Sequence, residues 1–191
     1  ALPLSGFLSV RVETARLRSD RAVSAFWRWW ADSGRARSSA ALASGDTRRV
    51  VPEITSHVEA IDPGLAWEFT AGEGGLPHRL TVTAAGVPEL RGAARRWLAQ
   101  APRGDASWSF ADLREPVRGC AMYFRDHRFA FDEAEVVVDL GLSRADVTVH
   151  HPGFAALRGS DASIAAYLLL DAVCGEEQVE TWVGVIRSKA T

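Results

Sequence analysis

The stretch that decides the fold is EVVVDLGLSRADVTVH, residues 135–150. Its two ends, Glu135–Leu140 and Asp146–His150, are rich in β-branched residues, and the residues GLSRA between them supply a turn. This pattern predicts a β-hairpin. A second hairpin is predicted where LAWEFT at 65–70 is followed by the turn residues AGEGGLP and then by HRLTVT at 78–83.

Shorter strand signals lie at 108–113 and 121–131. The strands come as adjacent hairpins and do not alternate with helices, which argues against a doubly wound nucleotide-binding fold. We therefore expect an α+β fold, in which a mainly antiparallel sheet of about six strands has helices packed on one face.

Helical spacing of apolar residues predicts helices at 19–34, 50–61, 88–101, 164–173 and from 176 onward. Between the first two lies GRARSSAALASGD, residues 34–46, which shows no clear period. We expect a mobile connection there, because glycine, serine and small residues without a period are typical of loops. The whole chain, 1–191, is expected to form a single α+β domain.

The composition is that of a globular protein, with 47% hydrophobic and 24% charged residues among 191. Only Cys120 and Cys174 are present, which excludes a disulfide framework and a CxxC zinc motif. No apolar run approaches the roughly 20 residues that span a bilayer, and residues 1–18 lack a signal-peptide pattern. We expect a cytoplasmic protein that does not contact membranes and, since no cofactor motif is present, needs no cofactor.

The densest polar feature is His150-His151, which precedes Pro152-Gly153 at the end of a predicted strand. Together with Asp139 across the hairpin or His127 on a neighbouring strand, these histidines would give a nitrogen and oxygen ligand set for zinc or iron. This set defines the alternative function, a small metal-assisted hydrolase. No HExxH-like spacing supports it, so the simpler interpretation is one exposed and one half-buried histidine at a turn.

Trp97 lies in the predicted third helix, and four arginines are near it in the sequence: Arg91, Arg95, Arg96 and, just after the helix, Arg103. Arginines beside an aromatic ring are typical of surfaces that follow a phosphate backbone, which makes Arg91 and Arg95 candidate binding residues. However, Trp97 belongs to the apolar stripe of its helix, and a pI of 6.2 lacks the usual basic character. Nucleic acid is therefore not the expected partner.

The segment FWRWW at 26–30 contains three of the seven tryptophans. Phe26, Trp27 and Trp30 share one helical face, whereas Trp29 is turned about a hundred degrees away from Trp30. Trp29 must therefore either pack against the 34–46 segment or be exposed. Because tryptophan is enriched at the centres of protein interfaces, an exposed Trp29 would indicate a protein partner or a homodimer.

Three segments together resemble an uncharacterised family of bacterial proteins: FWRWW at 26–30, LTVTAAGVPELRGAARRWLAQAP at 80–102 and AAYLLLDAVCGEEQVETWVGVI at 165–186. Their common features are structural, namely aromatic stripes, a helix begun by proline and a helix ended by glycine. The resemblance implies no activity and no catalytic residue. The sequence thus favours an interaction or accessory module of unknown partner over an enzyme.

Overall fold

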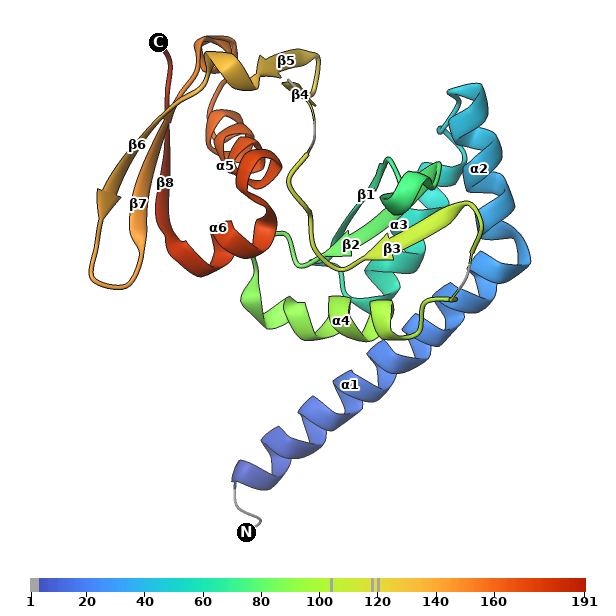
Figure 1. Ribbon diagram of the computed structural model, residues 1–191. Coiled ribbons are helices and arrows are strands. Elements are labelled where there is room, and N and C mark those ends of the chain that lie inside the picture. Colours follow the sequence, from blue (N-terminus) through green and yellow to red (C-terminus); the bar gives the residue numbers. More distant parts are fainter. Residues whose placement is uncertain (1–3, 104, 118, 120) are drawn as a thin grey trace. The chain divides into compact units, whose positions relative to one another are not determined.

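The computed structural model in Figure 1 describes residues 4–103, 105–117, 119 and 121–191, with side chains from residue 16 onward. Contacts within the chain divide it into two compact units, Ala1–Asp112 and Leu113–Thr191. Each unit has its own cluster of buried apolar side chains. The single domain expected for 1–191 stays a prediction.

The first unit begins with helical elements, of which the first three follow one another without a loop and the fourth follows after residues 45–49. Its first helical elements are α1 (Leu4–Trp29), the π-helix η1 (Trp30–Gly34), α2 (Arg35–Ser44) and α3 (Val50–Ile61). The helix expected at 19–34 therefore begins earlier, and the connection expected at 34–46 is helical for most of its length. Alanine, leucine and arginine are strong helix formers, but the buried side of this segment is Gly34, Ser38 and Ala41, which leaves no apolar stripe to detect.

A three-stranded sheet completes the first unit. Its remaining elements are β1 (Ala66–Thr70), η2 (Glu73–Gly75), β2 (His78–Thr83), η3 (Pro88–Leu90), α4 (Arg91–Ala99) and β3 (Trp108–Ala111). The expected hairpin is confirmed, since β1 and β2 pair antiparallel. However, β2 and β3 pair in parallel, because α4 lies between them in the chain and returns it to the same end of the sheet.

Aromatic rings fill the core of the first unit. Phe26, Trp30, Trp97 and Trp108 are almost completely buried. The Trp27 indole N–H donates a hydrogen bond to the Trp97 carbonyl oxygen at 2.8 Å, and the ring centroids of these two tryptophans are 4.8 Å apart. Helices α1 and α4 are joined in this way by both ring stacking and a buried hydrogen bond, each of which fixes their spacing.

The second unit contains two further sheets. Its elements are β4 (Ala121–Phe124), β5 (His127–Ala130), η4 (Phe131–Glu133), β6 (Glu135–Leu140), β7 (Ala145–His150), η5 (Pro152–Ala156), α5 (Asp161–Cys174), α6 (Glu176–Trp182) and β8 (Val183–Lys189). Strands β4 and β5 pair with each other. The other sheet has the order β6-β7-β8, and Val147 and Val149 of β7 are buried in the same cluster as Ala165, Leu169 and Leu170 of α5.

The last predicted helix is wrong beyond Trp182. We expected Val183 and Ile186 to continue its apolar stripe, but the residues from Val183 form β8, which pairs in parallel with β7. The segment VGVIRSK is rich in β-branched residues, and the edge of β7 opposite β6 offers it backbone hydrogen bonds. Pairing to that edge outweighs the helical spacing.

The α+β class is confirmed, but the single sheet of about six strands is wrong. The described residues contain sheets of three, two and three strands. The helices that precede β3 and β8 allow parallel pairs in addition to hairpins, so the strands do not join into one antiparallel meander. Among the helices of the described residues, none is long and apolar enough to cross a membrane.

Candidate functional site

His151 lies at the end of β7, where it is 1% exposed and fully hydrogen-bonded. Its Nδ1 accepts the backbone N–H of Gly153 at 2.9 Å, so the proton of the neutral ring is on Nε2, which donates to the Ala130 carbonyl oxygen at 3.1 Å. Both ring nitrogens are therefore occupied by the backbone. His151 holds β5, β7 and η5 together, and neither nitrogen has a lone pair left for a metal ion.

The other predicted metal ligands are not brought together with it. In the hairpin, His150 is paired with Glu135, whereas Asp139 is paired with Asp146, four residues away and roughly 13 Å along the strand at about 3.3 Å per residue. His127 lies on β5 and is paired with Phe124. Within the part of the chain that the structure describes, no group of three or more histidine, cysteine or acidic residues could hold a metal ion.

The two candidate arginines on α4 differ in their surroundings. The Arg91 guanidinium donates to the Asp112 carbonyl oxygen at 2.9 Å, while Arg95 is exposed. Trp97, on the same helix, is part of the buried core and is 0% exposed. The Trp97 ring is therefore not accessible to a base that would stack on it beside these arginines.

Trp29 packs onto two neighbours and stays half-buried. Its ring is stacked on that of His57 in α3, with the centroids 4.3 Å apart and the planes inclined by 27°. It also covers Gly34, where an added Cβ would lie only 2.8 Å from the indole. Of the two environments that the sequence left open, Trp29 shows packing against the 34–46 segment. Its role as an interface residue stays a prediction.

Strand β6 is an exposed edge strand of the second unit. All six of its residues are exposed, although four of them are apolar, and in Figure 1 the strand forms the outer edge of its sheet. The Gly141 N–H donates to the Arg144 carbonyl oxygen at the turn, so pairs 139/146, 137/148 and 135/150 are hydrogen-bonded to β7. The N–H and C=O groups of Val136, Val138 and Leu140 therefore point outward, away from β7.

The side chains of the same three residues extend an apolar surface. Opposite residues of an antiparallel pair share a face, so Val136 and Val138 lie on the face that carries the buried Val149 and Val147 of β7. On β6 this face is uncovered: Val138 is 51% and Leu140 is 88% exposed. We name this surface, made by the outward backbone and the side chains of Val136, Val138 and Leu140, the β6 edge.

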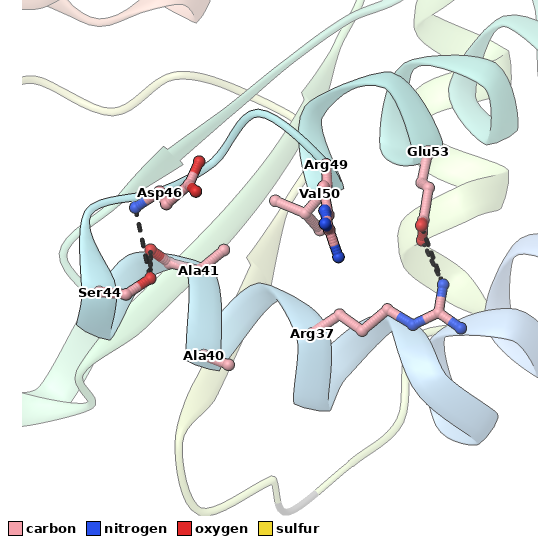
Figure 2. A pocket seen from close by; sticks show the side chains of 8 residues that line it. All are labelled: Arg37, Ala40, Ala41, Ser44, Asp46, Arg49, Val50 and Glu53. Carbon is pink, nitrogen blue, oxygen red and sulfur yellow. Dashed lines mark hydrogen bonds and ion pairs between the residues drawn. The ribbon is translucent and has the colours of Figure 1, made fainter.

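An open pocket of about 490 Å³ lies between α2 and α3 in the first unit, and Figure 2 shows its lining. The residues that line it are Arg37, Ala40, Ala41, Ser44, Asp46, Arg49, Val50 and Glu53. They come from the last turns of α2, the short connection after it and the first turn of α3. Sequence reasoning missed this pocket because it expected the 34–46 segment to be irregular.

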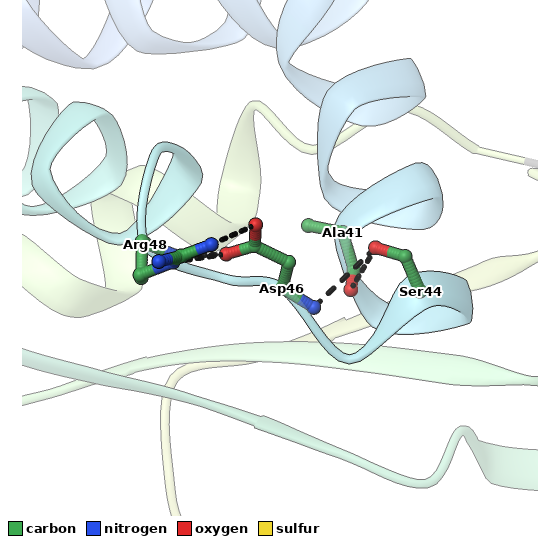
Figure 3. A network of polar contacts seen from close by, with 4 residues as sticks. All are labelled: Ala41, Ser44, Asp46 and Arg48. Carbon is green, nitrogen blue, oxygen red and sulfur yellow. Dashed lines mark hydrogen bonds and ion pairs between the residues drawn. The ribbon is translucent and has the colours of Figure 1, made fainter.

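Both carboxylates of the pocket are already paired with arginines. Arg37 Nη1 donates to the two carboxylate oxygens of Glu53 at 2.9 and 2.8 Å. Arg48, outside the pocket, donates from Nε and Nη2 to the two oxygens of Asp46 at 2.8 Å each, as Figure 3 shows. These hydrogen bonds lower the pKa of Asp46, so this carboxylate stays ionised in weak acid.

A buried polar cluster that the sequence analysis did not single out lies at the junction of α5 and α6. Asp171 and Glu176 are both 0% exposed. The Glu176 carboxylate accepts the backbone N–H of Arg114 at 2.9 Å, and the Arg114 guanidinium donates to Asp171 at 3.3 Å. An aspartate inside the apolar run 164–173 was the available signal, because a buried acid needs a partner.

The cluster shifts the titration of its members. Burial raises the pKa of Asp171 to about 7, an effect that the positive charge of Arg114 opposes and the negative charge of Glu176 increases. Burial, followed by the charge of Asp171, also raises the pKa of Tyr167, one turn earlier on α5.

In comparisons with protein-family models, curated proteins and solved structures, nothing matches this chain. The resemblance to an uncharacterised bacterial family stays an expectation.

Proposed function

We propose that this protein is an interaction module that binds an extended segment of another protein along the β6 edge. The observation that carries the proposal is a strand rich in valine and exposed along its whole length, with outward backbone groups at Val136, Val138 and Leu140. Such an edge is a template on which a further strand forms, which monomeric proteins usually protect with charge, proline or a covering loop.

The charges on β6 favour a basic partner. Glu135 and Asp139 lie on the other face of the strand, both are exposed, and neither has an ion-pair partner among the described residues. A strand added antiparallel to β6 would place its own side chains directly opposite these two carboxylates, four residues apart. Opposite charges across a strand pair stabilise it, so the partner segment should carry lysine or arginine at both positions.

The same charges disfavour a second copy of this chain. In any antiparallel register that joins the outward groups of two β6 strands around Val136–Val138, Glu135 or Asp139 of one copy lies opposite or diagonal to an acidic residue of the other. Like charges at these positions destabilise the pair. A heterologous basic segment is therefore the better fit, and we place this interaction in the bacterial cytoplasm, as the resemblance and the low cysteine content suggest.

The test uses a synthetic hexapeptide, VKITVK, whose lysines would lie opposite Asp139 and Glu135 in the antiparallel register. Fluorescence anisotropy of the labelled peptide is expected to give a saturable Kd in the micromolar range. Val138→Pro should weaken binding at least about tenfold, because proline lacks the N–H that would donate to the peptide. The hydrogen bonds between β6 and β7 stay intact, since the Val138 N–H does not point toward β7.

A second variant, Val138→Lys on β6, should abolish binding of the peptide. Its matched control is Val185→Lys on β8, which should preserve binding, because both valines are about half-exposed on edge strands of one sheet. Failure of the wild-type chain to bind the peptide, or equal binding by all variants, would overturn the proposal. Circular dichroism of each variant checks that the sheet is intact.

A further inference from the structure

The open pocket between α2 and α3 contains one cation that no acidic residue neutralises. Glu53 is paired with Arg37 and Asp46 with Arg48, so both acids of the lining are already neutralised. Arg49 has no ion-pair or hydrogen-bond partner among the described residues, and Figure 2 shows its side chain between Asp46 and Glu53. The pocket, with Arg48 counted, has a net charge of +1.

The remaining N–H donors of Arg37, like the positive charge of Arg49, favour an anionic ligand. Only Nη1 of Arg37 contacts Glu53, so the ion pair leaves the Nε and Nη2 hydrogens without a partner in the described residues. A guanidinium offers five N–H donors in a fixed plane, and two such groups around one space suit a planar anion. Carboxylates match the guanidinium fork with two parallel hydrogen bonds.

The rest of the lining is apolar. Ala40, Ala41 and Val50 contribute only hydrocarbon to the pocket, and the Ser44 hydroxyl is already engaged, since it donates to the Ala41 carbonyl oxygen and accepts the Asp46 N–H. A ligand that fits must therefore have an apolar portion beside its charged group. The volume of about 490 Å³ lies within the range of small-molecule sites.

We propose that this pocket binds a small organic carboxylate, with its carboxylate on Arg49 and the free donors of Arg37 and its apolar portion on Ala40, Ala41 and Val50. The proposal does not depend on the β6 edge, because all of its residues belong to the first unit. It assigns a ligand class to a part of the chain that the proposed interaction does not use.

The test follows the backbone amides of residues 37–53 by NMR during titration with sodium hexanoate, acetate or phosphate. Hexanoate should produce saturable shifts, with a Kd at least about threefold lower than that of acetate because its chain is buried. If phosphate binds and hexanoate does not, or if all three anions give the same unsaturable shifts, the site is not a carboxylate site.

Two variants and one control locate the effect. Arg49→Gln is expected to weaken hexanoate binding at least about tenfold, since a charge-assisted pair is lost. Arg28→Gln removes the same charge from an exposed position on α1 outside the lining, and it should leave binding unchanged. Ala40→Leu fills the pocket without any change of charge and should also weaken hexanoate binding. Equal binding by Arg49→Gln and the wild-type chain would overturn the proposal.

Discussion

Trp29 lies flat against His57, with the two ring centroids 4.3 Å apart, and so joins the end of α1 to the middle of α3. The contact exists because Gly34 leaves room for the indole one turn further along the chain. Glu53, which lines the pocket, is one turn before His57 on the same helix. The tryptophan that the sequence marks as unusual thus helps to position α3 beside α2.

Gly34→Ala is predicted to destabilise the first unit through this contact alone. The backbone at Gly34 is helical, with φ of −58°, so alanine is conformationally acceptable there, but its Cβ would lie 2.8 Å from the Trp29 ring. We expect a loss of about 1–3 kcal/mol in the free energy of unfolding, measured with urea.

The same substitution in a Trp29→Ala background should be neutral or stabilising, because the clash is gone and alanine is the better helix former by about 1 kcal/mol. An equal loss in both backgrounds would show that the ring does not cause the effect.

The pKa of His57 provides a second measure of the stacked pair. Burial lowers this pKa below 6.5, and the negative charge of Glu53 opposes that shift. In the folded chain the neutral ring is therefore favoured, and the unfolded chain binds the proton more readily. Stability should fall as the pH drops below about 6.5.

Trp29→Ala exposes the imidazole and should raise the pKa of His57 toward 6.5, as an NMR titration of the ring protons would report. His78→Gln, which removes a different half-buried histidine, should leave the His57 titration unchanged.

Asp171 predicts the opposite dependence on pH in the second unit. Its pKa is raised from 3.8 to about 7 by burial, so the folded state retains a proton that the unfolded state has released between these values. The free energy of unfolding should therefore fall as the pH rises from about 4 to about 7, by at most about 4 kcal/mol for this group.

Asp171→Asn removes the titration and keeps an oxygen for Arg114, so its stability should vary less with pH and exceed that of the wild-type chain at pH 8. Asp161→Asn on the same helix, whose partner Arg125 is exposed, is the control and should retain the dependence. Parallel pH profiles for wild type and Asp171→Asn would contradict the prediction.

Charge reversal on β6 should reverse its choice of peptide. With Glu135→Lys and Asp139→Lys combined, the basic probe VKITVK would meet like charges, and its acidic counterpart VEITVE would meet opposite ones. We expect a change of at least about tenfold in the ratio of the two dissociation constants, measured by anisotropy at low salt. An unchanged ratio would mean that the β6 edge binds by its backbone and apolar side chains alone.

The sequence predicts the elements whose pattern is local. The hairpin at 135–150 forms with the expected strands, because valines on both sides of a short turn need no distant partner to define them. The helix α3 also follows its stripe, since four of the five apolar residues expected in it are buried: Val50, Ile54, Val58 and Ile61. The fifth, Val51, is 38% exposed.

The elements that the sequence mispredicts depend on partners far away in the chain. Residues 183–189 form a strand because one edge of β7 is available to pair with them. The pattern of residues 183–189 alone does not indicate that this edge exists. The pocket could not be predicted for a similar reason, since it requires that two helices be known before their facing residues are compared. The sequence offered His151 as a metal ligand or as an exposed or half-buried turn residue, whereas it is fully buried. Its two hydrogen bonds depend on backbone groups of Gly153 and Ala130 that the sequence alone does not place.

The π-helix at Trp30–Gly34 sets the rotational phase of everything that follows it. A turn closed by i→i+5 bonds contains one more residue than a turn of α-helix, so α2 is displaced by one position, or about 100° of rotation, from where α1 would have carried it. Removal of a single residue from this turn would restore regular α-helical winding. Arg37 would then rotate away from Glu53, and the facing walls of the pocket would no longer be in register.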